Sequence, residues 1–552
     1  MTLFDWLIVL GINGAIVGYG VRISKKAKNT FDWFLAARGL PWWLVGPSLF
    51  ATAVDSGDYV AVVGGAYTFG LSNLATWWLG LPIGWFLVSF LVLVPVYRSG
   101  FFTNAEYLEH RFSPSVRLLS ALIQIQYRTN VLGNIAYSLY LMFTIPTGWG
   151  SSAWLLVVLV ALAAGSYSAA GGLRAVAVTD AMQSVFILIA ALVLWTAMWA
   201  SVGGWGGLVE RLAAAEPALE HEMLHVGGRE EPGVPVALVI FGWIAAHVAY
   251  VVVNHSQAMR LLAARSERDM RLATVLAAGA LAAVMWFNIT LGVMGRAIYP
   301  DLGSPDQVFP RMAMDYLAPG LLGLVVAGVL AGGVSTYDSI GSSLAAVFVR
   351  DIYARFFVPK ADDRHYLRVS RWATLVVLAI SFGYVPFLGD GMVALYMRLT
   401  SIAVMPLCSV TLMGALTRAH KRSGAVGLIA GILYGLSSFG ADRLSFDLPI
   451  WWTSPWWAYL WGLAIPATAM VAYSLVRGCA TPDEIPGLTL GSGSNAAIES
   501  AGDTWLERSR KEMPAIHAEK SRGRRVSLIQ RPAVWAAIFL AASAWMLFGE
   551  LW

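Results

Sequence analysis

Residues 316–349 read YLAPGLLGLVVAGVLAGGVSTYDSIGSSLAAVFV, an apolar run with a single charged side chain, Asp338. A helix needs about 20 mostly apolar residues to cross the hydrocarbon core of a bilayer. This run is longer than that, so it can span the membrane with a tilt or a break. The sequence therefore predicts a transmembrane helix that carries several hydroxyl groups and one carboxylate within the membrane.

Thirteen further stretches have the same character. Together with 316–349 the predicted spans are roughly 2–21, 42–69, 73–97, 118–146, 151–171, 176–201, 234–259, 272–299, 372–388, 391–416, 424–439, 455–476 and 533–550. The 552 residues are 58% hydrophobic and only 13% charged, with a mean hydropathy of +0.64, whereas soluble proteins carry about 25% charged residues. These values exclude a soluble enzyme, a disordered chain and a collagen-like fibre. They predict an all-α integral membrane protein with about 14 transmembrane helices.

The basic residues predict the orientation in the membrane, because lysine and arginine concentrate in cytoplasmic loops. With the N-terminus outside, 31 of the 38 basic residues fall on the inside. The inside stretches are then 22–38, 98–117, 172–175, 260–271, 350–371, 417–423 and 477–532. We expect both termini outside the cytoplasm, in an inner or plasma membrane. The stretch 477–532 is either a solvated basic loop or a contact for anionic lipid headgroups.

The polar centre of 316–349 indicates a cation site. Ser335, Asp338 and Ser339 are three and four residues apart, so they share one face of a helix. Hydroxyl and carboxylate oxygens are ligands for hard cations. The alternative is that the hydroxyls bond back to main-chain carbonyls while the small residues allow close helix packing.

The second predicted span is a poor continuous helix, because Asp55, Ser56, Gly57 and Asp58 lie within its apolar run. Broken helices of this kind expose main-chain carbonyls to an ion in transporters. The alternative is a kinked helix whose carboxylates lie at a wet end. Ionisable groups within membranes usually face a cavity, a partner or an ion path; the others in predicted spans are Arg128, Asp180, His247, His255 and Arg398.

Motifs for catalysis are missing from the sequence. It has no phosphate-binding GxxxxGK[ST] loop, no HExxH and no zinc-type Cys/His spacing. We therefore expect a transporter and not an enzyme or an ATP-driven pump.

Three stretches of the sequence resemble the sodium:solute symporter family, the group of sodium/glucose, sodium/proline and sodium/sialic acid cotransporters. They are GGLRAVAVTDAMQ at 171–183, Val334-Ser335-Thr336 followed by Asp351-Ile352-Tyr353, and FLAARGL at 34–40. The resemblance implies the five-plus-five inverted-repeat fold of LeuT-type transporters. One repeat would be the second to sixth predicted spans and the other the seventh to eleventh. The transport core is then 42–416, with an extra helix at 1–22, peripheral helices at 424–476 and a C-terminal helix at 533–552.

The resemblance also implies ligand sets, residue by residue. The main sodium site would use Ala51, Val54, Gly332, Ser335 and Thr336. A second sodium site would use Asp180, Asp338 and Ser339 together with Ser335, and here Asp338 replaces the hydroxyl expected of the family. The substrate positions would be Asp58, Trp77, Arg128 and Asn254.

These features predict a secondary active transporter that couples sodium entry to uptake of a small polar organic solute by alternating access. Its partners would be sodium, the solute and the lipid bilayer, without nucleic acid. A proton-coupled carrier, a channel or a membrane sensor on the same scaffold are the alternatives. Carboxylates, Arg128 and aromatic walls fit a zwitterion, an organic acid or an amine.

Overall fold

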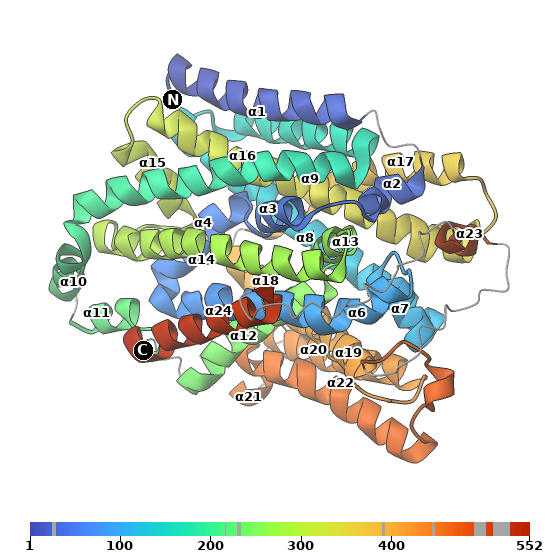
Figure 1. The fold of residues 1–552 in the computed structure, drawn as a ribbon. Helices are drawn as coiled ribbons and strands as arrows, with labels where there is room; N and C mark the ends of the chain where they lie inside the picture. The colour runs from blue at the N-terminus through green and yellow to red at the C-terminus, as the bar shows by residue number, and fades with distance from the viewer. Residues whose placement is uncertain are drawn as a thin grey trace.

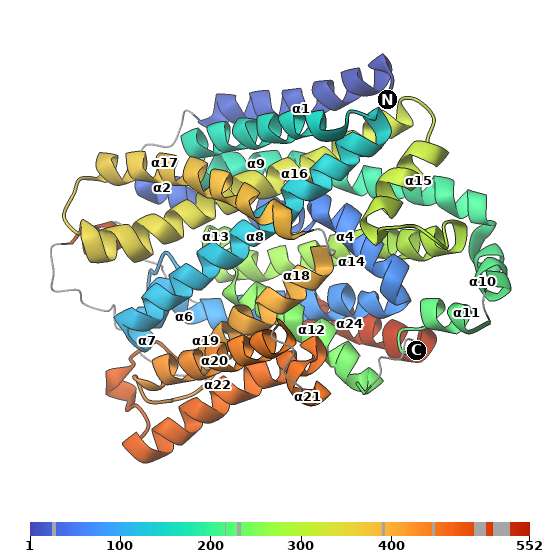
Figure 2. The same ribbon diagram turned by 180° about the vertical axis from the view of Figure 1, so that it is seen from behind.

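The computed structural model describes residues 1–24, 29–215, 217–228, 233–388, 392–443, 448–490, 504–511 and 530–552. Its helices follow one another along the chain as Figures 1 and 2 show. Those before the middle of the chain are α1 (Leu3–Ser24), α2 (Thr30–Leu35), α3 (Trp42–Ala53), α4 (Ser56–Phe69), α5 (Leu81–Leu87), α6 (Leu93–Arg98), α7 (Asn104–Arg111), α8 (Pro114–Thr147), α9 (Ala153–Val202), α10 (Gly204–Ala215), α11 (Pro217–Leu224) and α12 (Val236–Val253). The later ones are α13 (His255–Leu262), α14 (Glu267–Ile298), α15 (Val308–Tyr316), α16 (Leu321–Val347), α17 (Asp363–Ser381), α18 (Met392–Leu399), α19 (Met405–Leu416), α20 (Ser423–Arg443), α21 (Ile450–Thr453), α22 (Pro455–Arg477), α23 (Trp505–Lys511) and α24 (Pro532–Trp545).

In the part of the chain that the structure describes, twelve helical segments are long and apolar enough to cross a membrane. They match twelve of the fourteen predicted spans. The remaining two predictions correspond to α3 with α4, which are 12 and 14 residues long, and to α8, which is 34 residues long but more polar. A count of fourteen is therefore not established by helix length and composition.

The predicted break in the second span is confirmed. Between α3 and α4, Val54 and Asp55 have extended backbone angles. Asp55 caps α4, because its Oδ1 accepts the Gly57 N–H at 2.7 Å, and the Asp58 carboxylate accepts the Asp55 N–H at 2.8 Å. This reciprocal capping box satisfies two of the free N–H groups at a helix start. The break therefore exposes main-chain groups at the end of α3 while the start of α4 is capped.

A second break was not predicted. Residues 234–259 were expected to form one helix, but α12 ends at Val253 and α13 begins at His255. Asn254 lies between them, and its side-chain oxygen accepts hydrogen bonds from the N–H of Ser256 at 3.0 Å and from its hydroxyl at 2.8 Å. An asparagine N-cap thus ends one helix and starts the next.

The sequence has two consecutive glycines, Gly171 and Gly172, within α9, and the structure shows why the second must be glycine. Gly172 has φ +62° inside α9, and a Cβ there would lie 2.6 Å from the carbonyl oxygen of Trp33. Only glycine combines that backbone conformation with such a close approach. The label α9 therefore covers two helical segments that meet at the non-helical Gly172, and these match the two predicted spans 151–171 and 176–201.

Helix α16 is the central element of the fold. It packs against α9, α1, α8 and α3, and every residue from Val325 to Val347 is buried. Both chain termini lie at the same end of the molecule as α10 and α11, whereas α7 and α23 lie at the opposite end (Figures 1 and 2). The polar groups of α16 are consequently enclosed by other helices, far from either end.

Candidate functional site

The break after α3 faces the polar centre of α16. The Ser335 hydroxyl donates to the carbonyl oxygen of Ala51 at 3.1 Å. A Cβ added to Gly332 would lie 3.1 Å from the carbonyl oxygen of Val54, so the two backbones are in close contact. The structure thus brings together two segments that are about 280 residues apart in the sequence.

Thr336 is the fifth residue predicted for the main sodium site, and its hydroxyl group gives the clearest evidence for a ligand there. The side chain is fully buried, and its Oγ1 has no hydrogen-bond partner among the residues that the structure describes. Buried hydroxyls are normally paired, because an unpaired one costs free energy. The five residues predicted for the main sodium site are therefore neighbours, and the unpaired oxygen among hard donors fits a sodium ion.

The residues predicted for a second sodium site also meet, but around a cation of the protein itself. Asp180, on α9, accepts hydrogen bonds from the hydroxyls of Ser48 and Ser335, each at 2.6 Å. It also forms a fully buried ion pair with Arg260, with 2.8 Å between Nη2 and Oδ2. The Arg260 Nη2 donates to the Ser339 hydroxyl as well.

Asp338 lies next to this group. Its carboxylate accepts hydrogen bonds from the hydroxyls of Tyr167 and Ser339. Both of these donors are neutral hydroxyl groups. The cationic partner, Arg260, pairs with Asp180 and not with Asp338. The Ser339 hydroxyl therefore links Asp338 to Arg260, which is the ion-pair partner of Asp180.

The sequence analysis missed the role of Arg260, which it counted among the cytoplasmic residues 260–271. The structure places it on α13 with no solvent exposure, so its charge says nothing about topology. The sequence offered one signal: Arg260 directly follows the predicted span 234–259, at the end of that helix. Its partner lies 80 residues earlier, which no local pattern shows.

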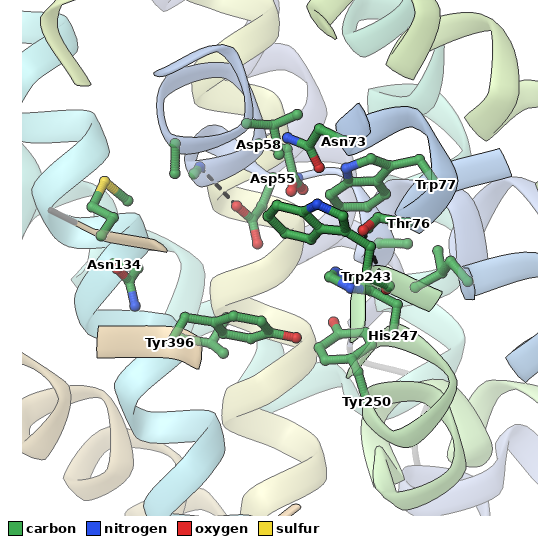
Figure 3. A pocket seen from close by; sticks show the side chains of 17 residues that line it. Asp55, Asp58, Asn73, Thr76, Trp77, Asn134, Trp243, His247, Tyr250 and Tyr396 are labelled. Carbon is green, nitrogen blue, oxygen red and sulfur yellow. Dashed lines mark hydrogen bonds between the residues drawn. The ribbon is translucent and has the colours of Figure 1, made fainter. Parts of the chain in front are cut away.

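A cavity lies beside the α3–α4 break and is lined in part by its residues. Its lining residues come from helices far apart in the sequence: Ala53, Asp55, Gly57, Asp58, Ala61, Val62, Asn73, Thr76, Trp77, Leu81, Val131, Asn134, Trp243, His247, Tyr250, Met392 and Tyr396. In Figure 3 the carboxylates of Asp55 and Asp58 stand beside Trp77 and Trp243, with Tyr250 and Tyr396 across the cavity. The cavity combines negative charge with aromatic walls.

Two of the four predicted substrate residues, Asp58 and Trp77, line this cavity. Arg128 does not line it but donates to the hydroxyl of Tyr250 at 2.9 Å, so it stands behind a lining residue. Asn254 does not line it either and caps α13. Trp243, Tyr250 and Tyr396 were missed, because in apolar helices they look like ordinary core residues, whereas His247 was noted as an ionisable group within a predicted span.

Comparison with known proteins identifies the family. The model of the sodium:solute symporter family matches residues 33–435, which is most of the chain. The chain belongs to this family. Three relatives that it resembles are sodium/glucose cotransporter 4 of Danio rerio (27% identical over 462 residues, 76% of this chain and 69% of the relative), the sodium/glucose cotransporter of Vibrio parahaemolyticus (27% over 465 residues, 79% and 85%) and sodium/myo-inositol cotransporter 2 of Rattus norvegicus (27% over 457 residues, 76% and 67%).

Solved structures give the same fold. The symporter is similar to a substrate-bound, outward-open Na⁺-coupled sialic acid symporter, with a TM-score of 0.74 and 19% identity over 87% of this chain and 99% of the other. It is also similar to Mhp1, a nucleobase-cation-symport-1 family transporter, with a TM-score of 0.53 and 14% identity over 83% and 97%. The predicted LeuT-type helical fold is confirmed. As a sodium:solute symporter, the protein is an integral membrane protein that performs sodium-coupled secondary transport.

Proposed function

We propose that the coupling sodium ion binds between the end of α3 and the centre of α16. Its ligands are the main-chain carbonyls of Ala51, Val54 and Gly332 and the hydroxyls of Ser335 and Thr336. The observation that carries this proposal is the buried, unpaired hydroxyl of Thr336, on the residue next to Ser335, whose own hydroxyl lies 3.1 Å from the Ala51 carbonyl oxygen. A cation there ties the broken helix to the central one.

The solute binds in the cavity lined by Asp58 and Trp77, beside the same break. Binding of sodium holds the end of α3 in place, and Ala53 and Asp55 of the same segment line the cavity. The sodium site and the solute site therefore share one short segment, which is the physical basis for coupling. Arg128 acts through Tyr250, and Asn254 shapes the bend that presents α12 to the cavity.

The orientation follows the distribution of basic residues. Both termini lie outside the cytoplasm, and 477–532 lies inside. Residues 42–416 form the transport core, 1–22 and 424–476 are peripheral, and 533–552 is a further helix. In an inner or plasma membrane, an inside-negative potential adds about 2.3 kcal/mol per sodium ion per 100 mV to the driving force for uptake. The protein performs no chemical conversion of its solute.

The test is transport by the purified protein in liposomes. A sodium gradient should drive accumulation of solute, and a proton gradient without sodium should not. Thr336→Ala should reduce sodium activation without loss of folded protein. Accumulation driven by protons alone, unaffected by sodium and by Thr336→Ala, would replace this proposal with a proton-coupled carrier.

A further inference from the structure

We propose that the cavity binds a small organic ammonium ion and that this ion is the transported solute; the proposal rests on the function proposed above and names its substrate class. Asp55 and Asp58 both line the cavity and are half-buried. None of the described lining residues is a lysine or an arginine. A ligand in the cavity therefore meets two carboxyl groups and no basic side chain, and a bound cation would hold these carboxyls in their charged form.

The capping bonds leave these carboxylates available. The bond to the Gly57 N–H uses Oδ1 of Asp55, and the bond to the Asp55 N–H uses Oδ2 of Asp58. The other oxygen of each carboxylate remains for a ligand. Arg128 offsets part of the charge from behind Tyr250, but one arginine does not neutralise two carboxylates.

A continuous aromatic wall runs from Trp77, beside the carboxylates, to Tyr250 and Tyr396 across the cavity (Figure 3). The ring centre of His247 lies 5.0 Å from that of Trp77, 5.9 Å from that of Tyr250 and 5.9 Å from that of Tyr396. The faces of tryptophan and tyrosine rings attract cations, and quaternary ammonium ligands are recognised by such aromatic cages. The wall and the carboxylates thus favour the same ligand charge.

Unpaired polar atoms in the cavity wall are complementary to an oxygen atom on the ligand. The indole Nε1 atoms of Trp77 and Trp243 have no hydrogen-bond partner within the described residues, and the two side chains are only 5% and 6% exposed. An indole N–H can only donate, so its partner must be an acceptor. A hydroxyl or ether oxygen on the ammonium compound supplies one. A neutral polyol would also satisfy the indoles, but it would leave the carboxylates without a counter-charge.

The test compares ligands of equal shape and different charge. Binding of choline and of its uncharged carbon isostere, 3,3-dimethylbutan-1-ol, is measured on the purified full chain in NaCl and in KCl, with ethanolamine, tetramethylammonium, D-glucose and myo-inositol alongside. We expect at least one ammonium compound to bind only in sodium and choline to bind at least tenfold more tightly than its isostere. Asp58→Asn keeps an oxygen for the Asp55 N–H but removes the charge, so it should weaken that binding at least tenfold. The control Asp315→Asn, in a surface ion pair with Arg311, should not.

Absence of sodium-dependent binding by all three ammonium compounds would overturn the proposal, whether or not D-glucose or myo-inositol binds. Binding of ²²Na⁺ without solute, and its loss in Thr336→Ala, tests the sodium site separately. The substrate class can therefore fail while sodium coupling stands.

A separate observation concerns the number of sodium ions. We infer that the guanidinium of Arg260 takes the place of a second sodium ion, so that one transport cycle carries one sodium. Its Nη2 contacts Asp180 and Ser339, its Nε donates to the Ser48 hydroxyl at 2.9 Å, and its Nη1 donates to the Ser256 carbonyl at 2.8 Å. These include the acidic and hydroxyl oxygens that a second ion would need.

A bare sodium ion does not fit beside this arginine. Asp180 is already neutralised by a buried ion pair and accepts two further hydrogen bonds. A second positive charge would face the guanidinium at short range where screening is weak. The guanidinium of Arg260, by contrast, is covalently attached to α13, so it holds α13 to α9 and α16 throughout the transport cycle.

The test is the stoichiometry of ²²Na⁺ binding at saturation. The wild-type chain should bind one sodium ion, and Arg260→Lys should also bind one because it retains the charge. Arg260→Gln should bind two, since it frees Asp180, while the control Arg38→Gln removes another buried arginine and should bind one. Two ions on the wild type, or one on folded Arg260→Gln, would overturn the inference. If Arg260→Gln does not fold, two ions on the wild type or on Arg260→Lys overturn it, and one ion on each supports it. No bound sodium on the wild type would instead contradict the main site.

Discussion

The hydroxyl oxygen of Ser335, in the middle of α16, lies 3.1 Å from the main-chain carbonyl oxygen of Ala51 at the last turn of α3, within hydrogen-bonding distance. The same hydroxyl lies 2.6 Å from Oδ1 of Asp180. A hydroxyl has a single proton, so it cannot donate to both acceptors at once. A sodium ion at Ala51 would remove this competition, because Ser335 would offer a lone pair to the ion and its proton to Asp180. The sodium site and the buried ion pair of Asp180 are thereby linked through one side chain.

The first prediction concerns the two hydroxyl ligands. Ser335→Ala and Thr336→Ala each delete one of five proposed oxygen ligands, so each should weaken sodium binding at least tenfold, about 1.4 kcal/mol. Binding of ²²Na⁺ to purified protein measures the change. Thr411→Ala is a matched control, since among the described residues that hydroxyl bonds only to the carbonyl of Leu407 on its own helix. Unchanged sodium affinity in both site variants would remove the proposed site.

The second prediction uses the close approach at Gly332. A methyl group there would lie 3.1 Å from the carbonyl oxygen of Val54 and 3.4 Å from main-chain atoms of Asp55. These contacts push the end of α3 away from α16 by a few tenths of an ångström. Gly332→Ala should therefore lower sodium affinity several-fold. Gly279→Ala, where the methyl group meets nothing within 4 Å, should leave sodium affinity unchanged; equal behaviour of the two variants would show that the spacing at Val54 does not matter.

Much of the fold followed from the sequence because membrane helices have to be long and apolar. The break at Asp55 was also visible, since two carboxylates with a glycine are costly inside a continuous membrane helix. The break at Asn254 was not, because a single asparagine in an apolar run is compatible with an unbroken helix. Only the capping bonds to Ser256 show its effect.

The candidate sites were predictable to different degrees. Ser335 and Thr336 stand out as hydroxyls in a span, and the resemblance to the family located the carbonyls that face them. Arg260 could not be found in this way, because its partner Asp180 is distant in the sequence and three more arginines follow it within 261–271. The aromatic cavity wall could not be found either. His247 meets Tyr396 only in the folded protein, where α12 packs against α19 and the two ring centres lie 5.9 Å apart.

The third prediction tests the orientation with a native side chain. Cys479 is exposed and Cys408 is buried in the described structure, so a membrane-impermeant maleimide should react with Cys479 alone. Because 477–532 is proposed to be cytoplasmic, labelling should occur in inside-out vesicles and not in right-side-out vesicles. In a Cys479→Ser background, Gly206→Cys on α10 should give the opposite pattern. Labelling of Cys479 from the outside would invert the proposed topology.

The fourth prediction concerns Asp306, which lies outside the membrane-spanning segments in the short helix Pro305–Gln307. Its Oδ2 accepts the N–H of Met392 at 3.4 Å, where α18 begins beside the cavity. Burial raises the pKa of Asp306 to about 6 from its usual 3.8, even though the Met392 N–H lowers it. Charging this carboxyl is therefore unfavourable in the folded protein relative to the unfolded chain.

The sign of the effect follows from that pKa. Above pH 6 the folded protein carries a buried charge that the unfolded chain exposes to water, so the carboxylate lowers the free energy of unfolding. This loss of stability shrinks as pH falls through 6 and is gone below about pH 4. Asn resembles the protonated carboxyl in shape, so Asp306→Asn should stabilise the protein and raise its melting temperature at pH 8. The gain in the free energy of unfolding should reach at most roughly 3 kcal/mol, which corresponds to a pKa shift of about two units. At pH 4.5 the gain should be small. Thermal unfolding of wild type and variant in detergent between pH 4.5 and 8 measures this, with Asp315→Asn as a surface control. A stability gain that is the same at both pH values would mean that the charge of Asp306 is not the cause.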